Sequence, residues 1–151
     1  MTNEVIIREI KKDEIAELLI LCQKHALYEK ADFSIEDKKQ RLEKYLFEDN
    51  SSIYCLVDEY QNSLIGYSTF MKQFSTWDAS FYLYMDCLFI DEKYRSLGIG
   101  KNLLLELKKK AKLLECNIIQ WQTPSFNTQA IKFYKKNKAI SKTKERFFLY
   151  L

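Results

Sequence analysis

Two of the three glycines of this 151-residue chain, Gly98 and Gly100, lie in one short segment, residues 94–101. The segment follows an apolar, aromatic run (residues 81–90) and precedes a run with helical periodicity (residues 103–114). Glycine lets the backbone adopt left-handed conformations and lets another molecule approach closely. A strand-to-helix junction with this freedom points unpaired N–H groups at one place, where the helix dipole favours an anion. The segment therefore predicts a phosphate-binding turn, although an ordinary tight turn that caps a helix would also use glycine.

The length and composition are those of one globular domain. With 151 residues, 47% of them hydrophobic, the chain can bury a full core, and we expect a single domain covering residues 1–151. The 24 Lys and Arg residues are interspersed with 21 Asp and Glu residues, giving a net charge of +3 without a concentrated basic patch. We therefore expect no binding of nucleic acid. No apolar run approaches the roughly 20 residues of a membrane span, and the start carries no apolar signal core, so we expect a cytoplasmic protein with no membrane partner.

The four cysteines are widely spaced and include no CxxC pair. The chain has a single histidine, His25, so the sequence does not indicate the cluster of ligands that structural zinc requires. The spacing also gives little support to a disulfide framework. We expect no metal, and we expect free thiols at Cys22, Cys55, Cys87 and Cys116.

Hydrophobic periodicity predicts an α/β (mixed α+β) fold with a central mixed, largely antiparallel sheet flanked by helices on both faces. Residues 53–59, 64–73 and 80–90 are expected to form an antiparallel meander. The other expected elements, in chain order, are a strand at 5–10, a helix from Asp13 to about residue 28 with Ile15, Leu18, Leu19, Cys22 and Ala26 inward, a helix after Ser34 with Leu42, Tyr45 and Leu46 inward, a helix starting at the glycines, a strand at 117–123, a short helix capped by Asn127 or Thr128, and a closing hairpin at 139–151.

Asp86 stands in the middle of the long aromatic strand at 80–90. Simple alternation predicts that it shares one face with Tyr82, Tyr84 and Leu88, while Met85, Cys87 and Phe89 share the other. A carboxylate is costly to bury in such surroundings without a purpose. Asp86 is therefore either a candidate catalytic base or a structural partner of an Arg or Lys.

The glycine segment does not match two common phosphate-binding templates. A Walker A loop needs Ser or Thr after Gly100-Lys101, where the chain has Asn102, and a dinucleotide fingerprint needs glycine at Leu103. The remaining pattern, R-x-x-G-x-G entering a helix, resembles the signature [Q/R]-x-x-G-x-[G/A] of the GNAT superfamily of acetyl-CoA-dependent N-acetyltransferases. A second block, residues 127–135, reads N-x-x-A-x-x-F-Y-K and resembles the later motif of that family. The expected order of elements is also similar to the GNAT fold.

Nearly the whole chain resembles the diamine (spermidine/spermine) and thialysine N-acetyltransferase branch. Residues 26–29 (ALYE) look like the KYE segment of that branch, residues 83–90 (LYMDCLFI) like its LYLEDFFV strand, and residues 131–135 (IKFYK) like its INFYK helix. The resemblance implies transfer of acetyl to the primary amine of a small molecule such as a polyamine, an amino-acid-like amine or an aminoglycoside. Acetylation of a protein or peptide is the alternative activity, and a non-catalytic acyl-CoA-binding sensor is the alternative class. By analogy with this branch, a homodimer is expected.

The resemblance implies acetyl-CoA as the cosubstrate. Backbone N–H groups of residues 96–101 would bind the pyrophosphate, with charge added by Arg95 or Lys101. An N–H near Leu88 would polarise the thioester carbonyl. Asn127 would bind the pantetheine arm, cap a helix, or do both. The expected acetyl-CoA site consists of Leu88, Phe89, Ile90, Arg95, Ser96, Leu97, Gly98, Ile99, Gly100, Lys101, Asn127 and Tyr134.

The same resemblance assigns catalytic roles to Tyr134 and Asp86. Tyr134 would be the general acid that protonates the departing thiolate, and its alternative role is that of a core aromatic on an amphipathic helix. Asp86 would be the base, acting through water. Cys87 as a nucleophile is not favoured, because a positioned histidine is missing and His25 lies in the first helix. Direct transfer in a ternary complex is therefore expected.

The amine is expected to contact Tyr28, Glu29, Asp86, Trp77 and Glu145. Two departures from the branch bear on its identity, because Asp86 replaces a glutamate and Cys87 replaces an aspartate. The shorter carboxylate and the lost negative charge reduce the acidity that a polyamine would need. Trp77 lies in a turn, where an exposed loop residue is the alternative interpretation.

Overall fold

The computed structural model describes residues 4–151, and within them the sheet has five strands in the order β1-β2-β3-β4-β5. The first three pairings are antiparallel, and β4 pairs with β5 in parallel. This mixed, largely antiparallel sheet confirms the expected fold class. The strands are β1 (Ile6–Glu9), β2 (Ile53–Tyr60), β3 (Ser63–Ser75), β4 (Ser80–Ile90) and β5 (Ile119–Gln120), and the α-helices are α1 (Ile15–Tyr28), α2 (Lys38–Phe47), α3 (Ile99–Leu113) and α4 (Thr128–Lys136).

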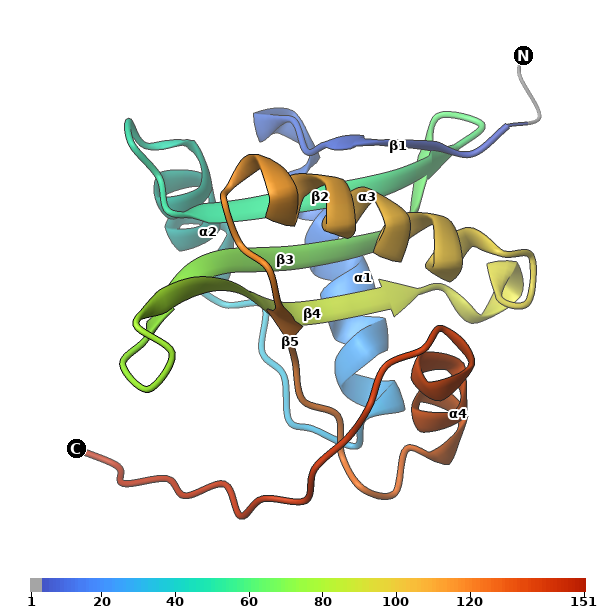
Figure 1. Cartoon of the computed structure of the whole chain (residues 1–151). Coiled ribbons are helices and arrows are strands. Elements are labelled where there is room, and N and C mark those ends of the chain that lie inside the picture. Colours follow the sequence, from blue (N-terminus) through green and yellow to red (C-terminus); the bar gives the residue numbers. More distant parts are fainter. Residues whose placement is uncertain (1–3) are drawn as a thin grey trace.

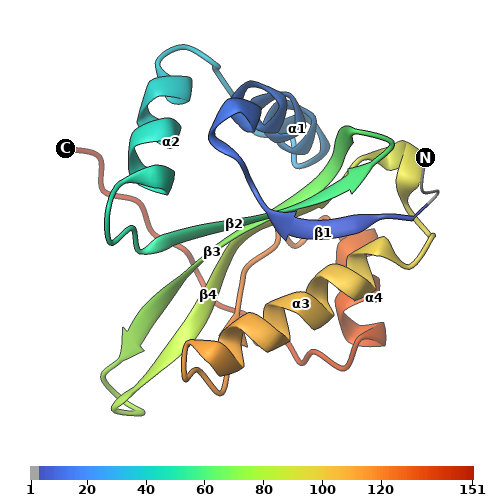
Figure 2. The same ribbon diagram turned by 90° about the horizontal axis from the view of Figure 1, so that it is seen from above.

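Helices cover both faces of the sheet, as Figures 1 and 2 show. On one face α1 and α2 pack over the strands, and on the other α3 crosses the sheet with α4 beside it. The core on the α1 face includes Ile15, Leu18, Leu19, Leu21, Val57, Tyr67 and Phe89. The core on the α3 face includes Leu56, Ile65, Phe70, Leu83, Met85, Leu103 and Leu107. The long meander is therefore buried on both sides, which suits its near-continuous apolar sequence.

The second helix starts later than expected. Asp37 has a φ of 61°, in the left-handed region, so the helix cannot include it and begins at Lys38. Ser34 instead accepts a hydrogen bond from the backbone N–H of Glu36 in the preceding loop. The expected inward position of Tyr45 is wrong, because Tyr45 is exposed, whereas Leu42 and Leu46 pack against the core.

The closing hairpin expected at residues 139–151 is absent from the described structure, and the prediction is wrong. The chain after α4 runs extended and exposed, away from the sheet (Figure 1). The expected strand at 117–123 is reduced to Ile119–Gln120, so β5 offers a very short edge. A strand forms only where a neighbour supplies hydrogen-bond partners, and here a single copy of the chain supplies few.

A β-bulge interrupts β4 at Asp86. Thr69 pairs with Cys87 and Phe70 pairs with Met85, so Asp86 is an extra residue opposite β3. The expected alternation fails here, because an extra residue reverses the faces beyond it. Leu88 therefore joins the α3-side core with Met85, while Cys87 packs on the α1 side.

The bulge lies where β4 and β5 part. The two strands pair only through Leu83 with Ile119 and Tyr84 with Gln120. Beyond Tyr84, no strand within residues 4–151 pairs with this edge of β4. The backbone of residues 85–90 is thus available to a ligand on that side.

Candidate active site

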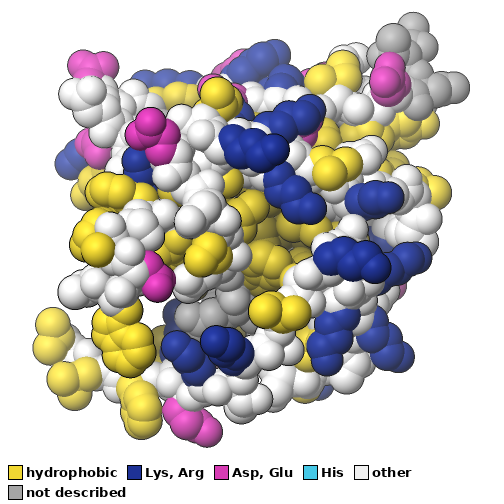
Figure 3. Space-filling view, in the orientation of Figure 1, with side chains coloured by type: hydrophobic (Ala, Val, Ile, Leu, Met, Phe, Trp, Pro, Cys, Tyr) yellow, Lys and Arg dark blue, Asp and Glu magenta, His cyan; other side chains and the backbone are white. Residues whose placement is uncertain are grey.

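A cavity of about 720 Å³ lies beside the free edge of β4. Its walls come from the end of α1, from β4, from the turn that leads into α3, and from α3 and α4. Figure 3 shows the hollow, with apolar side chains inside it and Lys and Arg side chains along one side. The cationic lining residues are Arg95, Lys101, Lys108, Lys132, Lys136 and Lys138, and the anionic ones are Glu29 and Asp86.

The N-terminus of α3 forms one end of this cavity. Gly98 has a φ of +80° and occupies the N-cap position, and no side chain caps the helix there. The N–H groups of Ile99, Gly100 and Lys101 belong to the first turn and have no carbonyl partner within the helix. Together with Lys101 on the same rim, they favour an anion such as a phosphate.

Gly100 has a packing role that the sequence did not indicate. A Cβ atom built at Gly100 would lie 3.0 Å from Cζ of Phe133 on α4. The missing side chain therefore allows α3 and α4 to pack closely, and Phe133 is a core residue of that contact. Gly98 is different, because a Cβ there would meet nothing within 4 Å and only its backbone conformation requires glycine.

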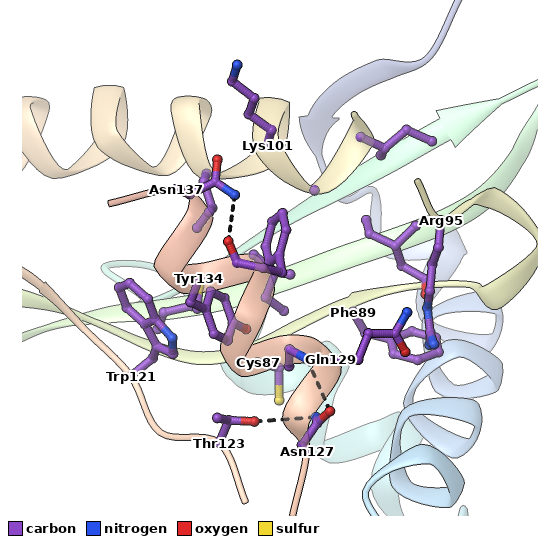
Figure 4. Close-up of a pocket in the computed structure, with 18 of the residues that line it drawn as sticks. Cys87, Phe89, Arg95, Lys101, Trp121, Thr123, Asn127, Gln129, Tyr134 and Asn137 are labelled. Carbon is purple, nitrogen blue, oxygen red and sulfur yellow. Dashed lines mark hydrogen bonds between the residues drawn. The ribbon is translucent and has the colours of Figure 1, made fainter. Parts of the chain in front are cut away.

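Arg95 turns away from the α3 terminus. Its Nε donates a 2.9 Å hydrogen bond to the carbonyl of Ile90, and its guanidinium lies 4.3 Å from the Tyr28 ring and 5.3 Å from the Phe89 ring. Figure 4 shows Arg95 beside Phe89, on the opposite side of the cavity from Lys101. The rim charge next to the helix terminus is thus supplied by Lys101.

The backbone of β4 faces the cavity at alternate residues. The Ile90 carbonyl is on the free edge, where it accepts from Arg95. Because backbone groups two residues apart in a strand point to the same side, the N–H of Leu88 also faces this edge. The backbone of Phe89 is directed to β3, where Phe89 pairs with Tyr67. Of the three expected strand contacts, Leu88 offers a free backbone N–H.

Asn127 is buried at the start of α4 and caps that helix. Its Oδ1 accepts from the N–H of Ala130 at 3.3 Å and from the Tyr28 hydroxyl at 2.8 Å, and its Nδ2 donates to Thr123 at 3.4 Å. The hydrogen bond to Tyr28 ties the end of α1 to the start of α4 across the cavity. The helix-capping alternative for Asn127 is thus confirmed.

Tyr134 lines the cavity from α4 and lies beside Trp121 (Figure 4). Its ring packs against Trp121, with ring centroids 5.0 Å apart. Burial raises the pKa of Tyr134 above its ordinary value, and the nearby Glu29 carboxylate acts in the same direction. The hydroxyl is therefore protonated at neutral pH and can donate a proton to a group that it touches.

Residues 13–138 match the family described as Acetyltransferase (GNAT) family. The chain belongs to this family of acetyltransferases. It is 26% identical over 139 residues to the thialysine N-epsilon-acetyltransferase of Sus scrofa, a match that covers 87% of this chain and 81% of that protein.

Solved structures show the same fold. An aminoglycoside acetyltransferase from an uncultured soil metagenomic sample superposes with a TM-score of 0.78 at 21% identity, covering 97% of this chain and 95% of that one. The aminoglycoside N-acetyltransferase AAC(6')-Iy, solved in complex with CoA, superposes with a TM-score of 0.82 at 14% identity, covering 99% and 97%.

Three of the site residues expected from sequence, Trp77, Leu97 and Glu145, lie outside the cavity lining. Trp77 is 99% exposed in the turn between β3 and β4, because the hairpin extends past the cavity. Glu145 lies on the exposed segment after α4, where the expected hairpin does not form. The side chain of Leu97 also faces solvent, although its neighbours Ser96 and Gly98 line the cavity.

The acceptor end of the cavity does bring Tyr28, Glu29 and Asp86 together. Asp86 is exposed at the bulge, with the Cys87 thiol 3.7 Å from its Oδ2. Burial raises the pKa of the Cys87 thiol to about 12, and the Asp86 charge adds to this effect. Cys87 is therefore a neutral thiol, which agrees with direct transfer and not with a cysteine nucleophile.

His25 and Trp121 are among the residues that line the cavity but were not expected in the site from the sequence. A signal for His25 was present, since it precedes Glu29 by four residues and so lies on the same side of a helix. Trp121 was expected inside a strand at 117–123, but β5 ends at Gln120, and Trp121 lies in the loop that follows it.

All four cysteines lie within the described part of the chain and are free. Across residues 4–151 there is no group of three or more His, Cys, Asp or Glu side chains that could hold a metal ion. None of the helices in that range is both long enough and apolar enough to cross a membrane.

Proposed function

We propose that this GNAT protein transfers the acetyl group of acetyl-CoA to the primary amine of a small molecule, directly within a ternary complex. One observation carries the proposal: a single cavity is lined by the uncapped N-terminus of α3, by the carboxylates of Glu29 and Asp86, and by Tyr134. A polyanionic cosubstrate fits the helix terminus, and a cationic amine fits the carboxylates.

The residues present fit acetyl-CoA. The first-turn N–H groups at Ile99, Gly100 and Lys101 would bind the pyrophosphate, and the other lysines of the rim suit its remaining phosphate. The free edge of β4 would pair with the pantetheine arm, which carries amide groups. The N–H of Leu88 would polarise the thioester carbonyl.

The bound ammonium group first releases one proton to solvent, and in the transfer step the neutral amine nitrogen attacks the thioester carbonyl carbon. The C–S bond breaks, its electron pair goes to sulfur, and the sulfur takes the proton of the Tyr134 hydroxyl. The nitrogen loses one proton to Asp86 through water, and this proton restores Tyr134. Tyr134 is the general acid and Asp86 the general base in this proposal.

The amine end supports a small, positively charged substrate. Glu29 and Asp86 supply negative charge there, and Tyr28 supplies an aromatic surface. Similar proteins are named for small amines, among them thialysine, L-ornithine and aminoglycosides. We include these three and spermidine as candidate substrates.

We further propose that the protein is cytoplasmic and acts as a homodimer. The free cysteines support the first statement. The second is supported by the segment after α4, which exposes Ile140 and, after six polar residues, five large apolar side chains in a row, namely Phe147, Phe148, Leu149, Tyr150 and Leu151. A second copy of the chain is the partner that would always be present to cover them.

The decisive experiment measures free-thiol release from acetyl-CoA with thialysine, L-ornithine, spermidine, sisomicin and a lysine peptide. Release with a small amine supports the proposal. Release with the peptide alone would point to protein acetylation, and no release with any amine would point to a sensor. A thermal shift assay runs beside it, because ligand at a hundred times its dissociation constant adds about 2.7 kcal/mol of stability. No shift with acetyl-CoA would overturn the cosubstrate assignment.

A further inference from the structure

The single histidine of the chain lies in the wall of the cavity, at its amine end. The His25 side chain is only 12% exposed. Its ring stacks on Phe89, with centroids 5.0 Å apart and an interplanar angle of 21°, and meets the edge of Tyr67 at 5.8 Å. The ring is therefore held in one orientation by packing on two sides.

Both ring nitrogens of His25 have a partner. Nδ1 lies 2.8 Å from the hydroxyl oxygen of Tyr67, and Nε2 lies 3.2 Å from Oε1 of Glu29. A carboxylate only accepts hydrogen bonds, so in the neutral ring Nε2 carries the hydrogen and donates it to Glu29. Nδ1 then accepts the Tyr67 O–H, and the buried tyrosine hydroxyl is satisfied. The three side chains form one continuous chain of hydrogen bonds.

Glu29 is the member of this chain that reaches the reaction centre. It lines the cavity, and its charge contributes to the raised pKa of Tyr134, so its carboxylate lies near the Tyr134 hydroxyl. Glu29 follows the last residue of α1, where the helix no longer fixes a side chain. The hydrogen bond from His25 supplies that constraint.

We propose that His25 is a positioning residue, which holds the Glu29 carboxylate at the amine end of the cavity and sets, by its own protonation, the net charge that the pair presents to the amine. With a neutral ring the pair carries a full negative charge and attracts an ammonium group. With a protonated ring the two charges cancel. This inference deepens the proposed function, and only its kinetic test depends on that function.

The surroundings of His25 favour the neutral ring at pH 7. Burial lowers the pKa of His25 below its ordinary value of 6.5, the Glu29 carboxylate opposes this, and the Arg95 charge reinforces it. The titratable and charged groups that face the ring from the packed elements are Glu29 from α1, Tyr67 from β3, Asp86 from β4 and Arg95 from the following turn, with the Cys22 and Cys87 thiols next to Tyr67. The ring therefore gains its proton, and the charge of the pair changes, at a lower pH than for an ordinary histidine.

The first test needs no substrate. Because the chain has one histidine, protein labelled with 15N-histidine gives one imidazole, whose NMR signals report its tautomer and its pKa. We expect the Nε2–H tautomer, and we expect Glu29→Gln to lower the His25 pKa by about one pH unit, since the stabilising charge is lost. Glu36→Gln, an exposed carboxylate outside the cavity, is the matched control and should leave the signals unchanged. The other tautomer, or an unchanged pKa in Glu29→Gln, would overturn the proposal.

The second test compares the amine KM of wild type and of His25 variants between pH 5 and 8.5. The amine is the one that gives the fastest thiol release among those named above. His25→Gln keeps an N–H donor for Glu29 but cannot titrate, whereas His25→Leu keeps neither property. We expect the ratio of KM for His25→Gln to that of wild type to fall as the pH drops through the His25 pKa, and to lie near one at pH 8. His25→Leu should raise the amine KM about tenfold at pH 8, because Glu29 loses a hydrogen bond to a charged group. The KM for acetyl-CoA should not change.

The amine ionises equally in both enzymes, so the ratio isolates His25. A ratio that stays constant with pH, or a wild-type KM in His25→Leu, would overturn the proposal. Leu27→Ala, a 74% exposed position on the same helix, controls for general effects on α1. If no amine gives thiol release, the proposed function fails, and the NMR test still decides whether His25 positions Glu29.

Discussion

At the scale of single residues, Tyr134 and its neighbour Phe133 have different roles on the short helix α4. Phe133 packs against Gly100, while Tyr134 lines the cavity. Replacing Tyr134 with Phe keeps the ring and its contact with Trp121 but removes the proton donor. Because general acid catalysis contributes roughly 10²–10⁴-fold, we expect kcat to fall by about a hundredfold or more, with the Kd for acetyl-CoA within about threefold of wild type.

Steady-state kinetics and isothermal titration with CoA measure these two quantities separately. Tyr45→Phe, which removes the hydroxyl of an exposed tyrosine on α2, is the control and should match wild type. An unchanged kcat in Tyr134→Phe would remove Tyr134 from the role of general acid.

A second residue, Asp58, makes folding stability depend on pH. Asp58 is fully buried on β2, and neither of its carboxylate oxygens has a hydrogen-bond partner among residues 4–151. Burial raises its pKa from 3.8 to about 7. The folded state then binds a proton that the unfolded state releases between these values, so stability is highest below pH 3.8 with respect to this group and is lost as the pH rises towards 7.

We expect this loss to reach about 4 kcal/mol, which Asp58→Asn should largely recover at pH 8, because the amide needs no proton to stay neutral. Urea unfolding at pH 5 and pH 8 measures it, with the exposed Asp49→Asn as control. The difference in unfolding free energy between variant and wild type should grow with pH. A difference that is the same at both values would contradict the prediction.

At the scale of elements, the start of α3 depends on the left-handed backbone of Gly98. Alanine there would meet no other atom, so Gly98→Ala tests the backbone alone. Forcing a side chain into this region costs about 1–2 kcal/mol, and we expect a Tm lower by roughly 2–8 °C. We also expect weaker binding of CoA, since the first-turn N–H groups move. Gly98→Asn is the matched control, because asparagine tolerates this conformation better and should lose less of both.

Differential scanning calorimetry and titration with CoA read the two effects. If Gly98→Ala and Gly98→Asn both leave the Tm and CoA binding nearly unchanged, the left-handed backbone at position 98 does not position α3.

Some helices, strands and turns could be predicted from the sequence, and others could not. The strand, glycine turn and helix around Gly98 were predictable, because each has a local cause: apolar residues, a conformation that glycine favours, and helical periodicity. The bulge at Asp86 was not predictable. An extra residue in one strand can be recognised only from the pairing with the neighbouring strand, and the sequence around Asp86 does not reveal that pairing. The short β5 and the absent hairpin were missed for a related reason, since pairing depends on which edges are available in space.

The residues of the candidate site also differ in whether the sequence could predict them. Asn127, Tyr134 and the α3 terminus belong to short motifs, and the structure brings them to one cavity. Glu29 and Asp86 come from segments distant in sequence, and only the resemblance to a family placed them together. His25 was placed only in the first helix, and its role could not be predicted because its partner Tyr67 lies 42 residues away, on β3. Trp77 was included because its turn adjoins the long strand, and Glu145 because of its negative charge. Nothing in their local sequence shows where a hairpin or an extended segment points.

At the scale of the whole molecule, the segment after α4 cannot be explained by one copy of the chain. Phe147 is 90% exposed and Leu149 is 88% exposed, within a run of apolar side chains that lies away from the sheet. Burying a large apolar side chain contributes roughly 1.5–3 kcal/mol, so an assembly that covers this run would gain considerable stability. The proposed homodimer therefore predicts that the apolar side chains of the run maintain the assembly.

We expect wild-type protein to be a dimer in light scattering at micromolar concentration, and Phe147→Ser with Leu149→Ser to weaken its Kd by about a hundredfold or more, as the loss of about 3 kcal/mol requires. Leu113→Ser, which removes an equally exposed leucine at the end of α3, is the control and should remain dimeric. The double variant should still show the thermal shift with acetyl-CoA, because neither residue lines the cavity. A wild-type monomer, or a double variant that dimerises as tightly as wild type, would show that something other than a second copy covers the segment.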